Sequence, residues 1–249
     1  MLSIRHTANA QFFRPTFGVR AGAGLSWYSP HIFYDTGTSS DTPGFSFNAG
    51  GLMNIKLITL SLLYDTTSSA FKLRYSLQPE VRFSHESASI EASNVYVSSG
   101  NKTNIYSTYA IHANQTTIQF PLLLKVSFFG QDNSPVGWLG VSFFGQDTSR
   151  AGRFGFFGGP SLLYFISYQE HTVAKPTFFP PFDPIDEVKN MRGFTNSVKL
   201  GAVAGIEYFI SDKSFVELRL NVVDHYMIEN DTKRTSSLNN INLGFGYMF

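Results

Sequence analysis

In two places in this sequence an acidic residue directly precedes a histidine, at Glu170-His171 and at Asp224-His225. A carboxylate that orients a histidine can support proton transfer, and the geometry of the pair is the first requirement for catalysis. Adjacent residues of a strand point to opposite faces, so the two members of each pair would turn away from each other. We therefore expect no catalytic residues and no enzymatic activity.

Other kinds of chemical site are equally sparse. There is no cysteine, which excludes a disulfide framework and thiolate metal ligands. The sequence contains no G-x-S-x-G motif, no P-loop and no HExxH pattern. A formal net charge of +1 gives no basic face for nucleic acid. We expect no cofactor, no metal site and no nucleic-acid partner. The six histidines are His6, His31, His85, His112, His171 and His225.

Charged residues of another kind have a regular spacing. Between residues 72 and 84, apolar side chains fall on every second position and charged or polar side chains fall between them. A strand directs such alternating residues to opposite faces. Taken over all similar segments, the charged residues on the polar face are Arg20, Lys72, Arg74, Glu80, Arg82, Lys125, Lys199, Glu207, Glu217 and Arg219.

The composition favours a membrane barrel. Aromatic residues make up 16% of the chain and charged residues only 15%, against roughly 25% charged residues in soluble domains. No apolar run approaches the roughly 18 residues that a spanning helix requires. Strands that face lipid on one side and a polar lumen on the other produce this mixture. We predict an all-β, transmembrane, up-and-down antiparallel barrel in the bacterial outer membrane.

Eight strands follow from the alternation, an even number as single-chain bacterial barrels have. They are predicted at residues 17–28, 45–55, 72–84, 118–128, 154–169, 198–210, 216–222 and 240–249. Long loops are predicted at 30–43, 85–115, 171–195 and 224–239, the second with strand extensions left open, and a tight turn at 211–214. Residues 58–70 fit either an extension beyond the membrane or an additional hairpin arm. A count of ten strands, using 58–64 and 136–144, is the alternative.

The remaining segments are assigned as follows. The sequence VSFFGQD at 126–132 recurs at 141–147, which we interpret as a tandem duplication that lengthens the connection 130–153. Ala8-Asn9-Ala10 resembles a signal cleavage site, so residues 1–10 are expected to be a signal-peptide remnant and 11–249 the barrel domain. Phe245, Tyr247 and Phe249 look like the barrel-closing C-terminal signal of outer-membrane proteins.

The charged face has two interpretations. Barrels of about eight strands are filled by side chains, so seven basic and three acidic groups would have to pair as a plug. The basic surplus would alternatively suit a narrow pore for small anionic solutes. Loops commonly carry the function of such folds. The aromatic segment 178–184 and the acidic residues Asp183, Asp186 and Glu187 would there suit a docked partner or a divalent ion.

Three segments resemble a known family. Phe17-Gly-Val-Arg-Ala-Gly22, Tyr75-Ser-Leu-Gln-Pro-Glu-Val-Arg-Phe83 and Ile118-Gln-Phe-Pro-Leu-Leu-Leu-Lys125 look like the PorT-like outer-membrane barrels of Bacteroidota. These carry a Gly-rich first strand, then an LQPEL strand, then an IPLLLK strand. The segments near 58–70 and 130–153 depart from that pattern. The resemblance implies a location and a fold, and, for the founding member, a link to type IX secretion and gliding.

The sequence thus favours a non-enzymatic outer-membrane barrel that acts through extracellular loops and partners, as an accessory of secretion or envelope assembly. The expected partners are outer-membrane lipid, the barrel assembly machinery, and secretion or envelope-complex proteins. A narrow porin or transporter for small solutes is the alternative. A soluble β-sandwich or lipocalin-like binder would need the apolar faces to be core, with a second layer against them.

Overall fold

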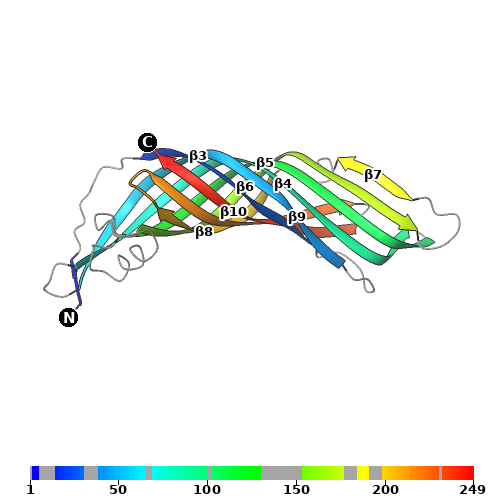
Figure 1. Cartoon of the computed structure of the whole chain (residues 1–249), viewed down its shortest axis with the longest axis horizontal. Coiled ribbons are helices and arrows are strands. Elements are labelled where there is room, and N and C mark those ends of the chain that lie inside the picture. The colour runs from blue at the N-terminus through cyan, green and yellow to red at the C-terminus, as the bar shows by residue number, and fades with distance from the viewer. Residues whose placement is uncertain are drawn as a thin grey trace.

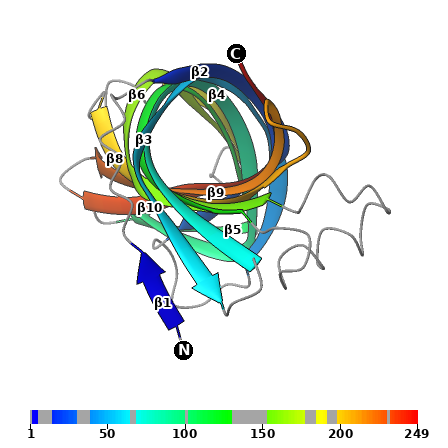
Figure 2. The ribbon, with the colours of Figure 1, turned by 90° about the vertical axis from the view of Figure 1, so that its left-hand side faces the viewer.

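The sheet closes on itself around a central axis. The computed structural model describes residues 2–5, 15–30, 39–64, 69–99, 102–129, 153–176, 184–190, 198–229 and 232–249. Within these ranges eight strands form a ring in the order β2-β3-β4-β5-β6-β8-β9-β10, and β10 pairs again with β2 (Figure 2). The neighbours are antiparallel throughout. The predicted up-and-down barrel of eight strands is confirmed.

Two short strands lie outside the ring. β1 (Leu2–Arg5) pairs with the end of β3, and β7 (Ile185–Asn190) pairs with the end of β6. The ring strands are β2 (Thr16–Pro30), β3 (Ser39–Tyr64), β4 (Ser69–Ser99), β5 (Lys102–Phe129), β6 (Arg153–Pro176), β8 (Val198–Phe209), β9 (Ser214–Glu229) and β10 (Thr232–Met248). β8, with 12 residues, is still long enough to span a membrane, which takes about 9–11 residues of strand.

Three adjacent strands rise well above β8. β4, β5 and β6 have 31, 28 and 24 residues, and they continue together at the end of the barrel away from the C-terminus (Figure 1). β6 stops pairing with β8 at Tyr164 but pairs with β5 as far as Pro176. We call residues 87–99, 102–114, 165–176 and β7 the extension. It stands as a curved wall on one side of the barrel.

The extension corrects two of the predicted loops. Most of residues 85–115 belong to the β4–β5 hairpin, which leaves only 100 and 101 outside the described strands. Within 171–195, β6 continues to Pro176 and β7 follows at Ile185. The predicted loop 224–239 is also wrong, because β9 runs to Glu229 and β10 begins at Thr232. Residues 85–115 therefore do contain strand extensions, the possibility that the sequence left open.

At the opposite end of the barrel, β3 is followed by β4 and β8 is followed by β9. Residues 58–64 continue β3, so they form a projecting arm with the start of β4, and the ten-strand count is wrong. The predicted tight turn is present: the N–H groups of Ile210 and Ser211 donate to the carbonyl oxygen of Ser214 at 2.9 and 3.2 Å. The Phe249 N–H donates to the Phe17 carbonyl at 2.8 Å, which ties the last residue to β2. The duplicated connection 130–152 lies outside the described residues.

Candidate functional site

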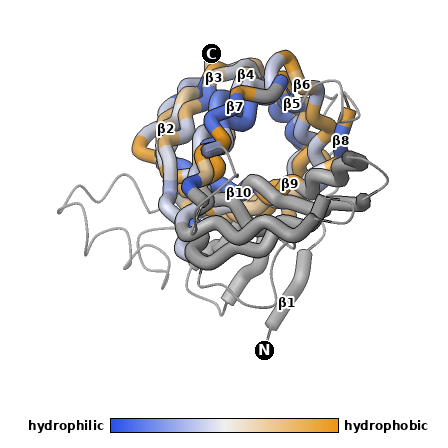
Figure 3. Tube along the Cα trace, turned by 90° about the vertical axis from the view of Figure 1, so that its right-hand side faces the viewer, coloured by the Kyte–Doolittle hydropathy of each residue, from blue (hydrophilic) through white to orange (hydrophobic). Residues whose placement is uncertain are grey.

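The outer surface of the ring is apolar. Large apolar side chains on every ring strand are about half exposed, and a soluble monomer rarely exposes a continuous apolar surface of this extent. The alternation of hydrophilic and hydrophobic residues can be followed along the strands in Figure 3. Lipid is the environment that suits such a belt. Its members include Val19, Leu25, Phe45, Val81, Phe120, Leu122, Leu124, Phe156, Leu162, Leu200, Ile206, Leu218, Leu220, Leu243 and Phe245.

The inner surface collects the charged residues that the sequence singled out. Arg74 is half-buried, and Lys72 lies on β4 with a side chain outside the described part. The other eight are buried: Arg20, Glu80, Arg82, Lys125, Lys199, Glu207, Glu217 and Arg219. The strand alternation therefore brings these residues together inside one lumen.

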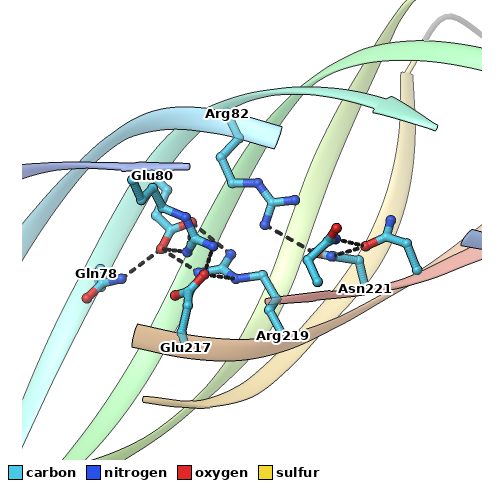
Figure 4. A network of polar contacts seen from close by, with 9 residues as sticks. Gln78, Glu80, Arg82, Glu217, Arg219 and Asn221 are labelled. Atoms are coloured by element: carbon cyan, nitrogen blue, oxygen red, sulfur yellow. Dashed lines mark hydrogen bonds and ion pairs between the residues drawn. The ribbon is translucent and has the colours of Figure 1, made fainter. Parts of the chain in front are cut away.

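Two contacts cross the whole lumen. Arg219 on β9 donates from Nη1 and Nη2 to the two carboxylate oxygens of Glu80 on β4, both at 2.9 Å (Figure 4). Strands β4 and β9 are four places apart in either direction around the ring of eight, so they are opposite walls. Arg82 on β4 bridges the same two strands, because its Nη1 donates to Asn221 Oδ1 at 3.2 Å. Both side chains of the Arg219–Glu80 pair are 0% exposed.

A second arginine completes a four-residue ion-pair cluster. Arg20 on β2 lies 3.3 Å from Glu80 Oε1 and also contacts Glu217 on β9. The Nε of Arg219 is 3.5 Å from Glu217, so each arginine contacts both carboxylates. Gln78 Nε2 donates to Glu80 Oε1 at 2.7 Å. Each buried charge of the cluster thus lies beside an opposite charge, which offsets the cost of removing it from water.

Further polar contacts lie on either side of the cluster along the barrel axis. Toward the C-terminal end, Lys125 Nζ on β5 lies 2.5 Å from Glu207 Oε1 on β8 and 4.7 Å from the centroid of the Phe209 ring. Toward the extension, Glu86 Oε1 accepts a bond from Asn240 Nδ2 at 2.7 Å and Glu86 Oε2 one from Gln115 Nε2 at 2.5 Å. These bonds fill the lumen at several heights.

The buried charges of the described residues balance. The sequence set held seven basic and three acidic groups, but it missed two acidic residues that alternation also turns inward, Glu86 and Glu170. The buried set is five basic, Arg20, Arg82, Lys125, Lys199 and Arg219, and five acidic, Glu80, Glu86, Glu170, Glu207 and Glu217. The basic surplus that suggested an anion-favouring pore is absent from this set.

The sequence analysis missed these two acids because both were placed at or beyond strand ends. A signal was present, since the alternation of β4 continues without a break through Ser84 and Glu86. Gln78, Asn221, Asn240 and Asn242 are also buried on the polar face, where their amides link the charged groups. Neutral amides carry no charge, but they donate and accept hydrogen bonds and can therefore connect buried charged groups into a network.

The polarity of the wall reverses at the base of the extension. On β4 the inward side chains change from Ser84 and Glu86 to Ala88 and Ile90, all buried. Their outward neighbours change from the half-exposed Phe83 to Ser87 and Ser89. The inward residues Ala88, Ile90, Ala113, Phe165 and Tyr168 form one apolar cluster. The extension is therefore apolar on its inner face and polar on its outer face, as expected of a sheet whose outer face meets water.

The remaining predicted residues have the following places. Phe245, Tyr247 and Phe249 are exposed on the outer surface next to β2 and β9. Of the acidic segment, Asp186 and Glu187 lie on β7 and are exposed, while 177–183 lies outside the described residues. His171 does not pair with the adjacent Glu170; its Nε2 lies 2.7 Å from Asp186 Oδ1, across the strand pair. In the described ranges no group of three or more His, Asp or Glu residues is placed to hold a metal ion.

A closed antiparallel ring with an apolar belt and a charged interior defines a class of protein, the outer-membrane β-barrel. The chain has this fold, and we place it in the bacterial outer membrane. No helix in the described part of the chain is long and apolar enough to cross a membrane.

Several solved structures are similar to this chain over most of its length. OprG from Pseudomonas aeruginosa is 11% identical, with 93% of this chain and 95% of that one covered and a TM-score of 0.35. Neisserial surface protein A is 10% identical, with 94% and 97% covered and a TM-score of 0.31. Ail, the attachment invasion locus protein of Yersinia pestis, is 9% identical, with 94% and 98% covered and a TM-score of 0.29. No protein-family profile and no curated protein sequence matches the chain.

Proposed function

We propose that the protein is a non-enzymatic outer-membrane barrel whose lumen is closed and whose function is carried by the extension. The observation that supports it most directly is the Arg219–Glu80 pair, which joins opposite walls with both side chains fully buried. Hydrogen-bonded side chains that bridge opposite walls obstruct a water path through the lumen. A narrow porin, the alternative role, is correspondingly disfavoured.

The extension is then the part that is free to meet other molecules. Short turns of such barrels face the periplasm and the longer connections face outward. The turn at Ser211–Lys213 and the residue Phe249 share one end, and the strands project furthest at the other. We therefore propose that the extension lies on the extracellular side. Its outward face is polar and exposed, which suits reversible contacts with a partner protein. By its resemblance to PorT-like barrels, we propose an accessory role in secretion or envelope assembly.

Conductance in planar lipid bilayers tests the closed lumen. We expect the purified protein to insert without producing open steps. The triple variant Glu80→Ala, Arg82→Ala, Arg219→Ala removes the groups that cross the lumen, so it should produce steps and thereby show that insertion occurs in the assay. Reproducible steps from the unmodified protein would rule out the closed lumen.

Cross-linking and co-purification from native outer membranes test the role of the extension. A partner should be retained by the full protein and lost when residues 89–112 are replaced by a short turn that reconnects β4 and β5. The shortened barrel must still shift in mobility on an SDS gel after boiling, which shows that its ring is intact. Retention of the same partners by the shortened barrel would contradict the proposal.

A further inference from the structure

Three side chains from neighbouring strands meet on the outward face of the extension. His112 on β5 and His171 on β6 are directly opposite each other in the strand register. Their ring centroids are 6.0 Å apart and the ring planes are inclined by 44°. Asp186 on β7 lies beside His171, with Oδ1 2.7 Å from Nε2. His112 and Asp186 are exposed and the side chain of His171 is 40% exposed, so solvent reaches the group.

The carboxylate determines which nitrogen of His171 is available. A carboxylate oxygen only accepts, so the hydrogen bond to Asp186 Oδ1 is donated by Nε2–H of His171. In the neutral form of the ring, Nδ1 then carries the lone pair. A histidine whose second nitrogen donates to a carboxylate is the usual arrangement of a metal ligand, because that bond fixes the tautomer and makes the ligating nitrogen more basic. The pair therefore prepares His171 to bind a cation through Nδ1.

We propose that His112 and His171 bind one divalent transition-metal ion, Zn²⁺ or Cu²⁺, with Asp186 orienting His171. A Zn–N bond of about 2.1 Å brings the centroids of two ligating rings to roughly 5–6 Å from each other, and the observed 6.0 Å is close to that spacing. The two exposed rings have to rotate so that one nitrogen of each faces the ion. Imidazole nitrogen is a ligand that suits both ions. The inference rests on these three residues and does not depend on the proposed function.

The site has two protein ligands, and its remaining positions are open to water or to a ligand from outside. This agrees with the absence, in the described part of the chain, of any group of three His, Asp or Glu residues arranged around one point. Cu²⁺ should bind more tightly than Zn²⁺, following the general order of divalent-metal affinities. Open positions would allow a donor group on a second molecule to complete the coordination, which would make the ion part of a contact surface.

The ion would also hold the extension together. β7 pairs with β6 in the described structure, and Asp186 connects it to the histidine that carries the metal. A bound ion would link β5 to β6 through the two rings and strengthen the attachment of β7 through the carboxylate. Metal binding is thus expected to slow amide hydrogen exchange in β7.

Titration of the full chain in detergent with Cu²⁺ tests the proposal, using protein purified without a polyhistidine tag. Electron paramagnetic resonance should show one Cu²⁺ coordinated by two imidazole nitrogens, and calorimetry with Zn²⁺ should show one ion per chain at the same site. His112→Gln and His171→Gln should each remove the two-nitrogen signal. Asp186→Asn should weaken binding by about 10- to 100-fold, the usual effect of losing such an orienting group.

His85→Gln is the matched control. His85 lies on the same wall, but its Nδ1 is engaged with Thr116 at 2.9 Å and its ring packs on Phe47, so binding should be unchanged. Ions held by His6, His31 or His225 persist in the His112→Gln, His171→Gln double variant and are subtracted. Each variant must keep the mobility shift on boiling. Equal Cu²⁺ binding by the unmodified protein and the double variant, or a signal with one nitrogen only, would overturn the proposal.

Discussion

The ring and the extension are built from the same strands but have opposite polarity. In the ring, Phe83 and Phe120 point outward while Glu80 and Gln119 are buried inside. Above Glu86, Ala88 and Ile90 are buried inside while Ser87 and Ser89 are turned outward. The change takes place within one alternating step of β4. It follows the surroundings: lipid selects apolar side chains outside, and water selects polar ones.

The comparison shows that alternation determines which residues share a face of the sheet. The polarity of those residues then indicates whether the face contacts lipid, water or the protein interior. Phe47, Phe83 and His85 lie together at the level of the reversal, with ring centroids 6.1 Å apart for Phe47–Phe83 and 5.4 Å for Phe47–His85. Aromatic girdles of outer-membrane barrels lie at the membrane interface. We infer that this group marks the outer edge of the lipid.

The largest loss of stability is expected from Arg219→Met, which removes the ion pair between the opposite strands β4 and β9. Glu80 and Glu217 each lose a buried cationic partner, and breaking a buried pair typically costs about 3–5 kcal/mol. Urea unfolding of the barrel in detergent should show this loss of stability. The double variant Arg219→Met, Glu80→Gln should recover part of it. Equal stability of the Arg219→Met variant and the unmodified protein would mean that the charges are solvated in an open lumen.

A comparable but local effect is expected from Phe165→Ala at the base of the extension. Phe165 is 0% exposed in the apolar cluster, and truncation of a buried phenylalanine costs about 3–5 kcal/mol. Hydrogen exchange should accelerate in β7 and in the β4–β5 hairpin above residue 87, while the ring stays protected. Equal acceleration in β8 and β9 would show that ring and extension unfold as one unit.

A smaller effect is expected from Leu243→Lys on the belt. Leu243 is 67% exposed on β10 near the middle of the strand, and a lysine facing lipid at the membrane centre costs about 2–4 kcal/mol. Unfolding from lipid vesicles measures the change directly. The same measurement in urea-containing buffer with short-chain detergent should give a smaller loss, since the detergent layer is thinner and wetter.

The smallest effect is expected from Asn114→Lys, the matched charge insertion on the outward face of the extension. Asn114 is exposed above the polarity reversal, where surface substitutions usually change stability by about 0.5 kcal/mol or less. The two lysine variants should be measured in the same vesicles. Similar losses from Asn114→Lys and Leu243→Lys would place the membrane edge above the aromatic group.

The ring could be predicted from the sequence because lipid makes its alternation extreme. Residues 72–84 and 118–128 show apolar side chains at every second position, and both belong to ring strands. The extension could not be recognised in the same way. Its outward residues Ser87, Ser89 and Asn114 and its small inward alanines resemble the composition of a loop. A polar segment can be a strand when a neighbouring strand pairs with it. Which strands pair is decided by the fold and cannot be read from the segment itself.

The residues of the lumen could be predicted, but their partners could not. Alternation along each strand was enough to identify the residues that turn inward, including Arg219 and Glu80. Which arginine meets which glutamate depends on strand order and on the height of each residue, and these follow from register. The neighbourhood of His112, His171 and Asp186 depends equally on register, because no sequence spacing connects three strands.

The ion pairs of the lumen join strands that lie far apart in the chain. The seam between β2 and β10 joins Gly18 to Met248, and the crossing pair joins Glu80 to a residue 139 positions later in the chain. Until β9 reaches its place, Glu80 has no Arg219 and the partly formed sheet exposes charge on the face that will become the interior. Unpaired charge is costly in lipid, so we expect a sheet that lacks β9 to enter the bilayer less readily than the closed ring. The ion pairs of the interior are complete only when β2, β4 and β9 are all in place.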